Sequence, residues 1–317
     1  MEPSALPHPI RRRRPEGSTI DHWHAPDGWP IRRFDWPAVG QARGALLFLG
    51  GRGDIFEKHL EAFAHWQTRG WSVTAFDWRG HGGSGRLTAD GTVGHLDSFT
   101  SLIDDLAAFW RDWTAPAPRV AMGHSMGGNV LAHALLSGRI MAAGAVLLSP
   151  MVRIRSPLGA GISERIARWQ CRRADPGRAA WTAKAGDAAR ADAEAMLTAD
   201  YGRLLDEHWW HERMPGLRLG PPSWGWLAAA FASGRALETL ARTAPALDLS
   251  VLLLAADDDR LTDTRASRRF AQARGEIVLH RFPHGVGHEL LREIDPVRDR
   301  ALATIDRLLD DVAARYQ

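Results

Sequence analysis

The sequence contains short, continuously apolar runs that alternate with segments of helical periodicity. Strands that are apolar on both faces are typical of a parallel sheet covered by helices on each side. The pattern therefore predicts an α/β fold with a mostly parallel central sheet and helices on both faces. The expected strands are Ala45–Gly50, Ser72–Asp77, Arg119–Met122, Ala145–Ser149, Ser250–Ala255 and Glu276–Phe282. The expected helices are Phe56–Thr68, Phe99–Trp113, Met126–Leu136 and a long closing helix within Leu290–Ala313.

Two parts of the chain break this alternation. Residues 1–25 are rich in Pro, Arg and His without periodicity, and we expect an irregular arm that leads into an edge strand near Trp29–Trp36. Residues 151–240 are rich in arginine, alanine and tryptophan and show no clear strand, which predicts an inserted helical cap, or lid. Residues 26–150 and 241–317 are then the α/β core.

The charge composition argues against a nucleic-acid partner. The 40 basic and 37 acidic residues leave a formal net charge of +3, which is too balanced for a nucleic-acid-binding surface. The run Arg11–Arg14 is interpreted as part of a solvated arm, with contact to an anionic membrane surface as the alternative. The sequence does not predict an oligomeric state.

Cysteine usage and hydropathy indicate a reducing compartment. The single cysteine, Cys171, excludes an intramolecular disulfide, and no Cys/His cluster indicates a zinc site, so no metal is expected. The apolar run of a signal peptide does not follow Arg11–Arg14, and no segment has the length of a membrane span. We therefore expect a cytoplasmic protein.

A serine lies between glycines directly after a predicted strand. The sequence Gly123-His124-Ser125-Met126-Gly127 follows Arg119–Met122 and opens the predicted helix Met126–Leu136. This strand–turn–helix setting is the one in which Gly-x-Ser-x-Gly presents a nucleophilic serine, although a tight βα turn needs small residues for packing alone. Other residues of the chain are needed to distinguish a nucleophilic serine from a turn that packing alone requires.

A serine nucleophile needs a base and an orienting carboxylate, in the chain order Ser, Asp, His. Carboxylates cluster after the strand Ser250–Ala255, and His288 lies on a glycine-containing loop after the next strand. Parallel strands end at the same edge of a sheet, where open α/β sheets build their sites. Several neighbours are instead interpreted as turn, capping or structural residues: Asp257, Asp258, Asp263, His280 and His284.

The loop Gly50-Gly51-Arg52-Gly53 follows an early strand and supplies the second half of a predicted oxyanion hole. Its glycines allow a backbone amide to approach the substrate oxygen, and we assign that amide to Arg52. The other donor is the amide of Met126, the residue after the serine. The alternative is an ordinary glycine turn; a phosphate-binding P-loop is disfavoured because the Gly-Lys-Ser/Thr ending is missing.

Over about residues 25–315 the chain resembles the α/β-hydrolase fold, and more narrowly the monoacylglycerol lipase and bacterial lysophospholipase group. The resemblance weakens through the cap. It rests on Gly50–Gly53, Asp77–Gly85 (DWRGHGGSG), Gly123–Gly128, Asp259–Asp263 (DRLTD) and Gly287–Glu289. In the family the Asp-Trp-Arg-Gly-His loop shapes the rim of the active site. This chain departs from many relatives in having Gly50-Gly51 where they have His-Gly.

The resemblance implies that Ser125 is the nucleophile, Asp259 the triad acid and His288 the base, with the amides of Arg52 and Met126 as oxyanion donors. It implies a hydrolase of monoacyl lipid esters that works through an acyl-enzyme without a cofactor. A general carboxylesterase, a thioesterase or an acyltransferase would use the same triad. A non-catalytic ligand-binding module is the remote alternative, because such modules usually lose a triad member.

Tryptophans and arginines of the predicted cap are candidates for substrate contact. Tryptophans of the cap either pack it on the core or line an acyl-chain site, and Trp224 and Trp226, with Gly51 and His124, are the predicted substrate-binding residues. A phosphate head group would find candidate partners in Arg153, Arg155, Arg172 and Arg173. Arginine is so frequent in this chain that a structural role for these four is favoured.

Overall fold

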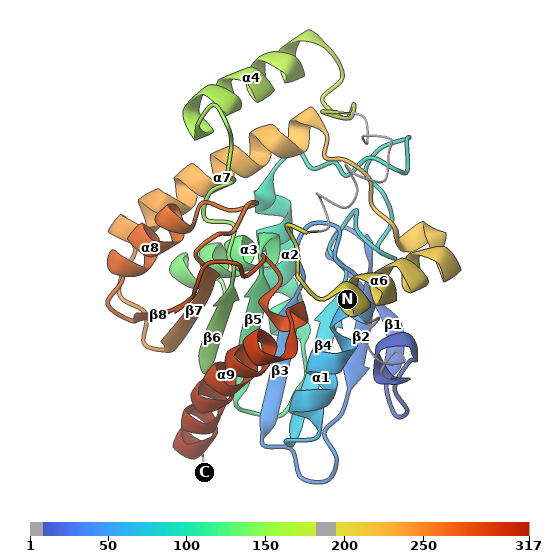
Figure 1. Cartoon of the computed structure of the whole chain (residues 1–317), viewed down its shortest axis with the longest axis vertical. Helices are drawn as coiled ribbons and strands as arrows, with labels where there is room; N and C mark the ends of the chain where they lie inside the picture. Colours follow the sequence, from blue (N-terminus) through green and yellow to red (C-terminus); the bar gives the residue numbers. More distant parts are fainter. Residues whose placement is uncertain (1–8, 182–194, 317) are drawn as a thin grey trace.

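A computed structural model of the chain describes residues 9–181 and 195–316. Within these residues an eight-stranded sheet has the order β1-β2-β4-β3-β5-β6-β7-β8 (Figure 1). Only the pairs β1·β2 and β2·β4 are antiparallel. The strands are β1 (Thr19–His24), β2 (Pro30–Trp36), β3 (Gly44–Leu49), β4 (Trp71–Phe76), β5 (Arg119–His124), β6 (Gly144–Leu148), β7 (Ser250–Ala256) and β8 (Ile277–Phe282).

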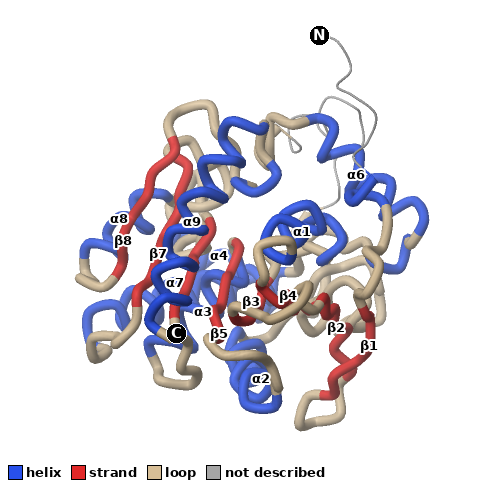
Figure 2. The backbone as a smooth tube through the Cα atoms, turned by 90° about the horizontal axis from the view of Figure 1, so that it is seen from below, coloured by secondary structure: helices blue, strands red, loops and turns tan. Residues whose placement is uncertain are grey.

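Helices cover both faces of this sheet (Figure 2). On one face α1 (Leu60–Gln67) and α9 (Asp295–Arg315) enclose one apolar core, and on the other α2 (Phe99–Asp112), α3 (Met126–Leu136), α7 (Trp224–Thr243) and α8 (Thr264–Gln272) enclose a second. The remaining described helices are α4 (Ala160–Arg173), α6 (Tyr201–Arg213), η1 (Pro9–Arg12), η2 (Phe56–His59), η3 (Pro215–Leu217) and η4 (Leu290–Arg292). The predicted mostly parallel sheet with helices on both faces is confirmed.

The strand order creates a switch point beside β3. The chain leaves β3 toward β4 on one side and returns to β5 on the other, and both neighbours pair with β3 in parallel. The loops after β3 and β5 therefore diverge from a common edge of the sheet, which is where open α/β sheets hold their ligands. The turn that contains Ser125 follows β5, so the fold places it at this point.

The predicted irregular arm over residues 1–25 is wrong for its described part. Residues 9–12 form η1, and β1 adds an edge strand before β2, so the sheet begins earlier than Trp29. The burial of β1 has no period of two, because four of its six residues, Thr19, Asp21, His22 and His24, are exposed. A strand that is exposed at the sheet edge lacks the alternation by which strands are recognised in a sequence.

Between β6 and β7 the described residues form α4, α6, η3 and α7, with no strand among them. The expected cap boundary at residue 240 falls inside α7, which also packs on the core beside α3 through Ala230 and Leu237. α4 lies on the outer side of α7 (Figure 1). The division into core and cap stays a prediction. Across the described parts of the chain, every helix is too short or too polar to span a bilayer.

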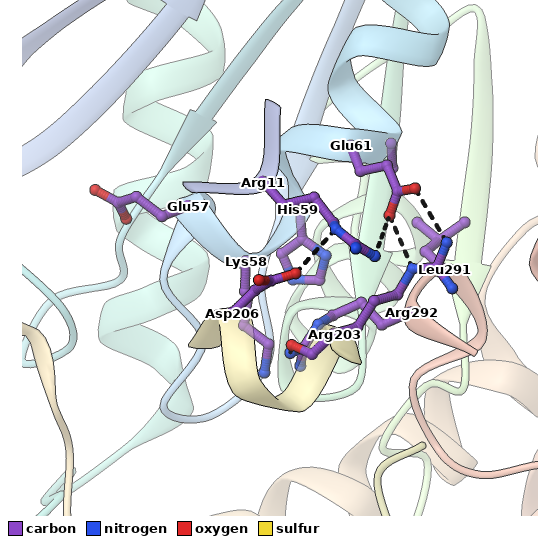
Figure 3. A pocket seen from close by; sticks show the side chains of 10 residues that line it. Arg11, Glu57, Lys58, His59, Glu61, Arg203, Asp206, Leu291 and Arg292 are labelled. Atoms are coloured by element: carbon purple, nitrogen blue, oxygen red, sulfur yellow. Dashed lines mark hydrogen bonds and ion pairs between the residues drawn. The ribbon is translucent and has the colours of Figure 1, made fainter. Parts of the chain in front are cut away.

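Ion pairs fix α6 to the core (Figure 3). Arg203 is 4% exposed, and its guanidinium contacts Glu61 of α1 at 2.8 Å and Asp295 of α9 at 2.7 Å. Arg11 of η1 pairs with Asp206 of α6 at 2.9 Å, and Arg12 pairs with the same carboxylate at 2.5 Å. These pairs correct the interpretation of Arg11–Arg14 as part of a solvated arm, because Arg11 and Arg12 hold the N-terminal segment against α6.

We predict that Arg203→Ala lowers the free energy of unfolding by about 3 kcal/mol, because it leaves carboxylates without their buried partner. The Glu61 side chain is 19% exposed and that of Asp295 is 73% exposed, so we place this value at the low end for a broken buried pair. Urea denaturation measures the change. Arg268→Ala on the exposed side of α8 is the control and is expected to stay within about 0.5 kcal/mol of the parent. Equal losses in both variants would contradict the anchoring role.

Candidate active site

Ser125 occupies a backbone conformation that side chains other than glycine rarely adopt. Its φ is 51° and its ψ is −112°, between the end of β5 and the first residue of α3. Its amide donates to the Leu148 carbonyl, and its carbonyl accepts from Met151, both at 2.9 Å. Such a residue costs on the order of 1–3 kcal/mol and persists only where its surroundings enforce it. The turn raises Ser125 above the sheet edge at the N-terminus of α3.

The glycines around Ser125 are required by close backbone approach. A Cβ on Gly123 would lie 2.6 Å from the Gly127 carbonyl oxygen, and one on Gly127 would lie 2.5 Å from the Gly50 carbonyl oxygen. Neither site has room for a methyl group, since real Cβ contacts this short are essentially never seen. The packing explanation and the chemical explanation of this motif therefore describe the same turn.

The loop after β3 lies against Ser125. A Cβ on Gly51 would be 3.0 Å from Cβ of Ser125, and the Gly51 amide already donates to Asp54 at 2.7 Å. In the described parts of the chain no acceptor is found for the amides of Arg52 or Met126. These are the two amides that the sequence predicts as oxyanion donors, and their assignment stays a prediction.

Asp259 follows β7 and is held by its own loop. Its carboxylate accepts hydrogen bonds from the Leu261 amide at 2.8 Å, the Thr262 amide at 2.9 Å and the Thr262 hydroxyl at 2.8 Å. Burial raises its pKa, but the His288 charge and these hydrogen bonds outweigh burial and lower the pKa of Asp259 to about 2. Asp259 is therefore a carboxylate at any pH near neutrality.

His288 is buried two residues before η4 and faces Asp259. Its Nδ1 lies 2.6 Å from Oδ2 of Asp259, and its backbone amide donates to the Met196 carbonyl. Burial alone would lower the pKa of His288, but the attraction and hydrogen bond of Asp259 raise it above the ordinary histidine value. Because Nδ1 is engaged by the carboxylate, Nε2 is the ring nitrogen left for proton transfer.

Ser125 and His288 line one cavity of about 240 Å³. Gly51, His124 and Arg52 line it too, and substrate binding by Gly51 and His124 stays a prediction. Most of the remaining wall is apolar and comes from the loops after β6 and β7, the segment before α6 and the first turn of α7. The cavity thus combines a raised serine, a histidine–carboxylate pair and an apolar wall.

Of the two predicted tryptophans, Trp226 lines this cavity and Trp224 does not, within the residues that the structure describes. The guanidinium of Arg178 lies 5.7 Å from the Trp224 ring instead. Residues two positions apart on an α-helix point about 200° apart, so both side chains cannot face one cavity from the same turn of α7. Trp224 therefore lies outside this cavity in the described structure, and its assignment as a substrate contact stays a prediction.

Other candidates of the sequence lie outside the cavity. Asp263 caps α8 by accepting from the amides of Arg265 and Ala266, as interpreted, and His284 forms an exposed pair with Asp258 at 2.6 Å. Arg153 pairs with Glu238, Arg155 donates to the Asp259 carbonyl, and Arg172 is exposed near the end of α4 together with Arg173. The favoured structural role of these arginines agrees with their places.

The loop Asp77–Gly85 is fixed by a buried network. Asp77 accepts from Arg32 at 2.9 Å and from the Gly83 amide at 2.8 Å, while Ser84 donates to the Asp77 carbonyl. A Cβ on Gly82 would collide with the Asp77 carboxylate. These contacts hold the loop in place beside β4 and β2. They agree with the structural role that the family resemblance implies for this loop.

A buried ion network beneath the cavity was not predicted from the sequence. Lys58 contacts Asp54 at 2.8 Å, Glu289 at 2.7 Å and Glu207 of α6 at 3.2 Å. Arg292 joins the same carboxylates Glu289 and Glu207. Lys58 is one of two lysines in a chain with 40 basic residues, and this rarity is the sequence feature that points to a special role for it. Its partner Glu289 lies 231 positions away, so no local pattern predicts that pair.

Asp54, His59 and His124 are close enough to hold a metal ion, with one ligand atom from each inside 4.8 Å of the others. Asp54 is already surrounded by donors, however: the Gly51 amide, Lys58 and Nδ1 of His124 at 2.8 Å. These contacts lower its pKa despite burial, with Lys58 the largest of the lowering influences. The cluster is explained without an ion, and the expectation of no metal stays a prediction.

A family model described as "Serine aminopeptidase, S33" matches residues 40–295. The chain is also 31% identical over 296 residues to "Lysophospholipase L2" of Escherichia coli K12, a match that covers 88% of this chain and 84% of that protein. The chain belongs to the family that this model describes, the serine aminopeptidase S33 family. A "Probable lysophospholipase L2" of Haemophilus influenzae is 25% identical, with 84% of each chain covered.

Solved structures confirm the α/β-hydrolase fold. A soluble variant of monoglyceride lipase from Saccharomyces cerevisiae, in complex with a substrate analogue, superposes with a TM-score of 0.75 at 18% identity and covers 97% of this chain and 100% of that chain. A monoacylglycerol lipase of Paleococcus ferrophilus gives 0.69 at 18% identity, covering 88% and 98%. At these identities the likeness is one of fold, and the resemblance drawn from the motifs is confirmed.

We predict that the His288 imidazole titrates above the usual histidine range and that Asp259→Asn lowers its pKa, because the variant removes the charge that stabilises the imidazolium. Histidine NMR titration measures both values. His284→Gln, which removes the exposed pair with Asp258, is the control and is expected to leave the His288 titration in place. A His288 pKa that Asp259→Asn does not move would contradict the pairing.

Proposed function

We propose that this chain is a serine hydrolase that cleaves carboxylic esters of monoacyl lipids, either lysophospholipids or monoacylglycerols, through an acyl-enzyme on Ser125. The observation that carries the proposal is the placement of Ser125, at a positive φ, in one cavity with His288, whose Nδ1 is paired with the buried Asp259. A raised serine, a base and an orienting carboxylate are the parts that acyl transfer requires.

In this mechanism Nε2 of His288 takes the hydroxyl proton as Ser125 attacks the ester carbonyl carbon. Asp259 keeps the proton of Nδ1 in place and stabilises the imidazolium that forms. The amides of Met126 and Arg52 donate to the oxyanion, where one such donor contributes about 3 kcal/mol of transition-state stabilisation. The imidazolium then protonates the leaving alcohol, and water releases the fatty acid by the same steps.

Two observations support a lipid ester as the substrate. The curated relatives that match most of the chain are named as lysophospholipases. The cavity beside Ser125 also has an apolar wall, formed by Met151, Ile154, Leu227 and Leu261 among others, and its volume of about 240 Å³ suits a single acyl chain. Sites for bulkier, drug-sized ligands usually measure about 300–1,000 Å³.

The charge of the cavity disfavours aminopeptidase activity, which the family description names. An aminopeptidase must hold the free α-ammonium group of its substrate, and this needs an unpaired carboxylate or similar acceptor near the serine. Both carboxylates of the described wall that stand near Ser125 are already paired, Asp54 with Lys58 and His124 and Glu289 with Lys58 and Arg292. Contact with a membrane surface and a cytoplasmic location stay predictions.

We predict that the purified protein releases fatty acid from 1-acyl lysophospholipid or monoacylglycerol, and that Ser125→Ala lowers kcat/KM by roughly 10³-fold or more. Titrimetric release of fatty acid measures the rate. Ser149→Ala is a matched control, because Ser149 also has a positive φ, 42°, directly after the neighbouring strand β6, and is not part of the cavity wall in the described structure. Hydrolysis that survives in Ser125→Ala would contradict the proposed nucleophile.

A further inference from the structure

The side chain of Arg52 lies in the wall of the cavity that holds Ser125. Its guanidinium carbon is 5.3 Å from the centre of the Trp226 ring, and Nη2 donates to the Gly220 carbonyl at 2.5 Å. Within residues 9–181 and 195–316 no carboxylate lies within ion-pair distance of it. Arg52 thus contributes a full positive charge that the described protein does not neutralise.

Arg52 is half-buried and unpaired, whereas the fully buried arginines of the described structure are neutralised. Arg32 pairs with Glu57 and Asp77, Arg203 with Glu61, and Arg292 with Glu289. Burial lowers the pKa of Arg52 to about 10, so it is still protonated at neutral pH. A desolvated charge without a partner is costly, and a bound anion removes that cost.

Two hydrogen-bond donors of this wall have no acceptor in the described structure. They are Nε of Arg52 and the indole Nε1 of Trp226, and both atoms are buried. Neither group can accept a hydrogen bond, so a ligand that brings acceptor oxygens satisfies both. A planar guanidinium binds a phosphate with two parallel hydrogen bonds, which makes phosphate the fitting anion.

The length of the side chain matches the position of a phosphate in the proposed substrate. The Arg52 amide is the predicted donor to the acyl carbonyl oxygen. As many bonds separate this amide nitrogen from the guanidinium carbon as separate the acyl carbon from phosphorus in a lysophospholipid acylated at the end of its glycerol. One residue is therefore long enough to contact the reacting carbonyl through its amide and the phosphate through its guanidinium.

We propose that the Arg52 side chain, with the indole N–H of Trp226 as second donor, binds the phosphate of the lipid head group and selects lysophospholipid over uncharged monoacylglycerol. This inference rests on the proposed function and names the substrate class for the same site. Arg52 then has two roles, since its backbone amide faces the oxyanion and its side chain faces the head group.

The test compares kcat/KM for a lysophospholipid and for a monoacylglycerol with the same acyl chain. The ratio of the two is expected to fall roughly ten- to hundredfold in Arg52→Gln, the loss that follows when a hydrogen bond to a charged group is removed. Arg52→Lys keeps the positive charge but not the planar pair of N–H donors, and the ratio is expected to fall less in this variant. Arg260→Gln removes one positive charge from an exposed residue beside Asp259 and is the control, with the parent ratio expected.

A second measurement does not depend on activity. Glycerol 3-phosphate is expected to raise the melting temperature of the parent protein more than glycerol does, and Arg52→Gln is expected to remove the difference. Stabilisation by glycerol 3-phosphate without hydrolysis of either lipid would contradict the proposed function but support the phosphate site. A parent enzyme with no preference for lysophospholipid, or equal losses on both lipids in Arg52→Gln, would overturn the phosphate site and keep the hydrolase.

Discussion

The turn between β5 and α3 has no room for a side chain at either of the glycines that flank Ser125. The carbonyl groups of Gly127 and Gly50 occupy the space that a Cβ would need at Gly123 and at Gly127. This contact brings α3 against the ends of β3 and β5 and leaves Ser125 at a φ of 51°. The loops of Asp259 and His288 reach the same cavity because β7 and β8 end at the same edge of the parallel sheet.

Below the cavity, the buried ions connect the site to α6. Lys58 touches the loop after β3 through Asp54, the residue after His288 through Glu289, and α6 through Glu207. Buried ion pairs contribute little net stability compared with apolar residues of the same volume, but they tolerate few alternative arrangements. The network thus connects α6 to the catalytic loops, and within the described residues none of its carboxylates pairs with Arg52 in the cavity wall.

Local patterns predicted most of the fold. The expected helix Met126–Leu136 has the observed bounds, and the apolar strands are displaced by at most a few residues, because buried parallel strands read as continuous apolar runs. β1 was missed because an exposed edge strand such as Thr19–His24 has no such run. The order Ser125, Asp259, His288 could be predicted from the sequence, because each of these residues follows one of the predicted strands.

Features that depend on side-chain direction or on contacts between distant residues could not be predicted from the sequence. Trp224 and Trp226 look alike in the sequence and differ only in the side of α7 that they occupy. The Lys58 network joins residues of three separate segments, and no local period marks the pairs of Lys58 with Glu207 and Glu289. The glycine loop predicts a role for the backbone amide of Arg52, whereas no local pattern indicates that its side-chain charge has no carboxylate partner within the described residues.

Labelling of the purified protein with a fluorophosphonate probe, followed by peptide mapping, tests the central claim most directly, because only an activated serine reacts with such a probe. The account predicts a single adduct on Ser125 that collapses in His288→Ala. A folded parent protein that takes no label, or an adduct on another serine, would contradict the assignment of Ser125 as the nucleophile.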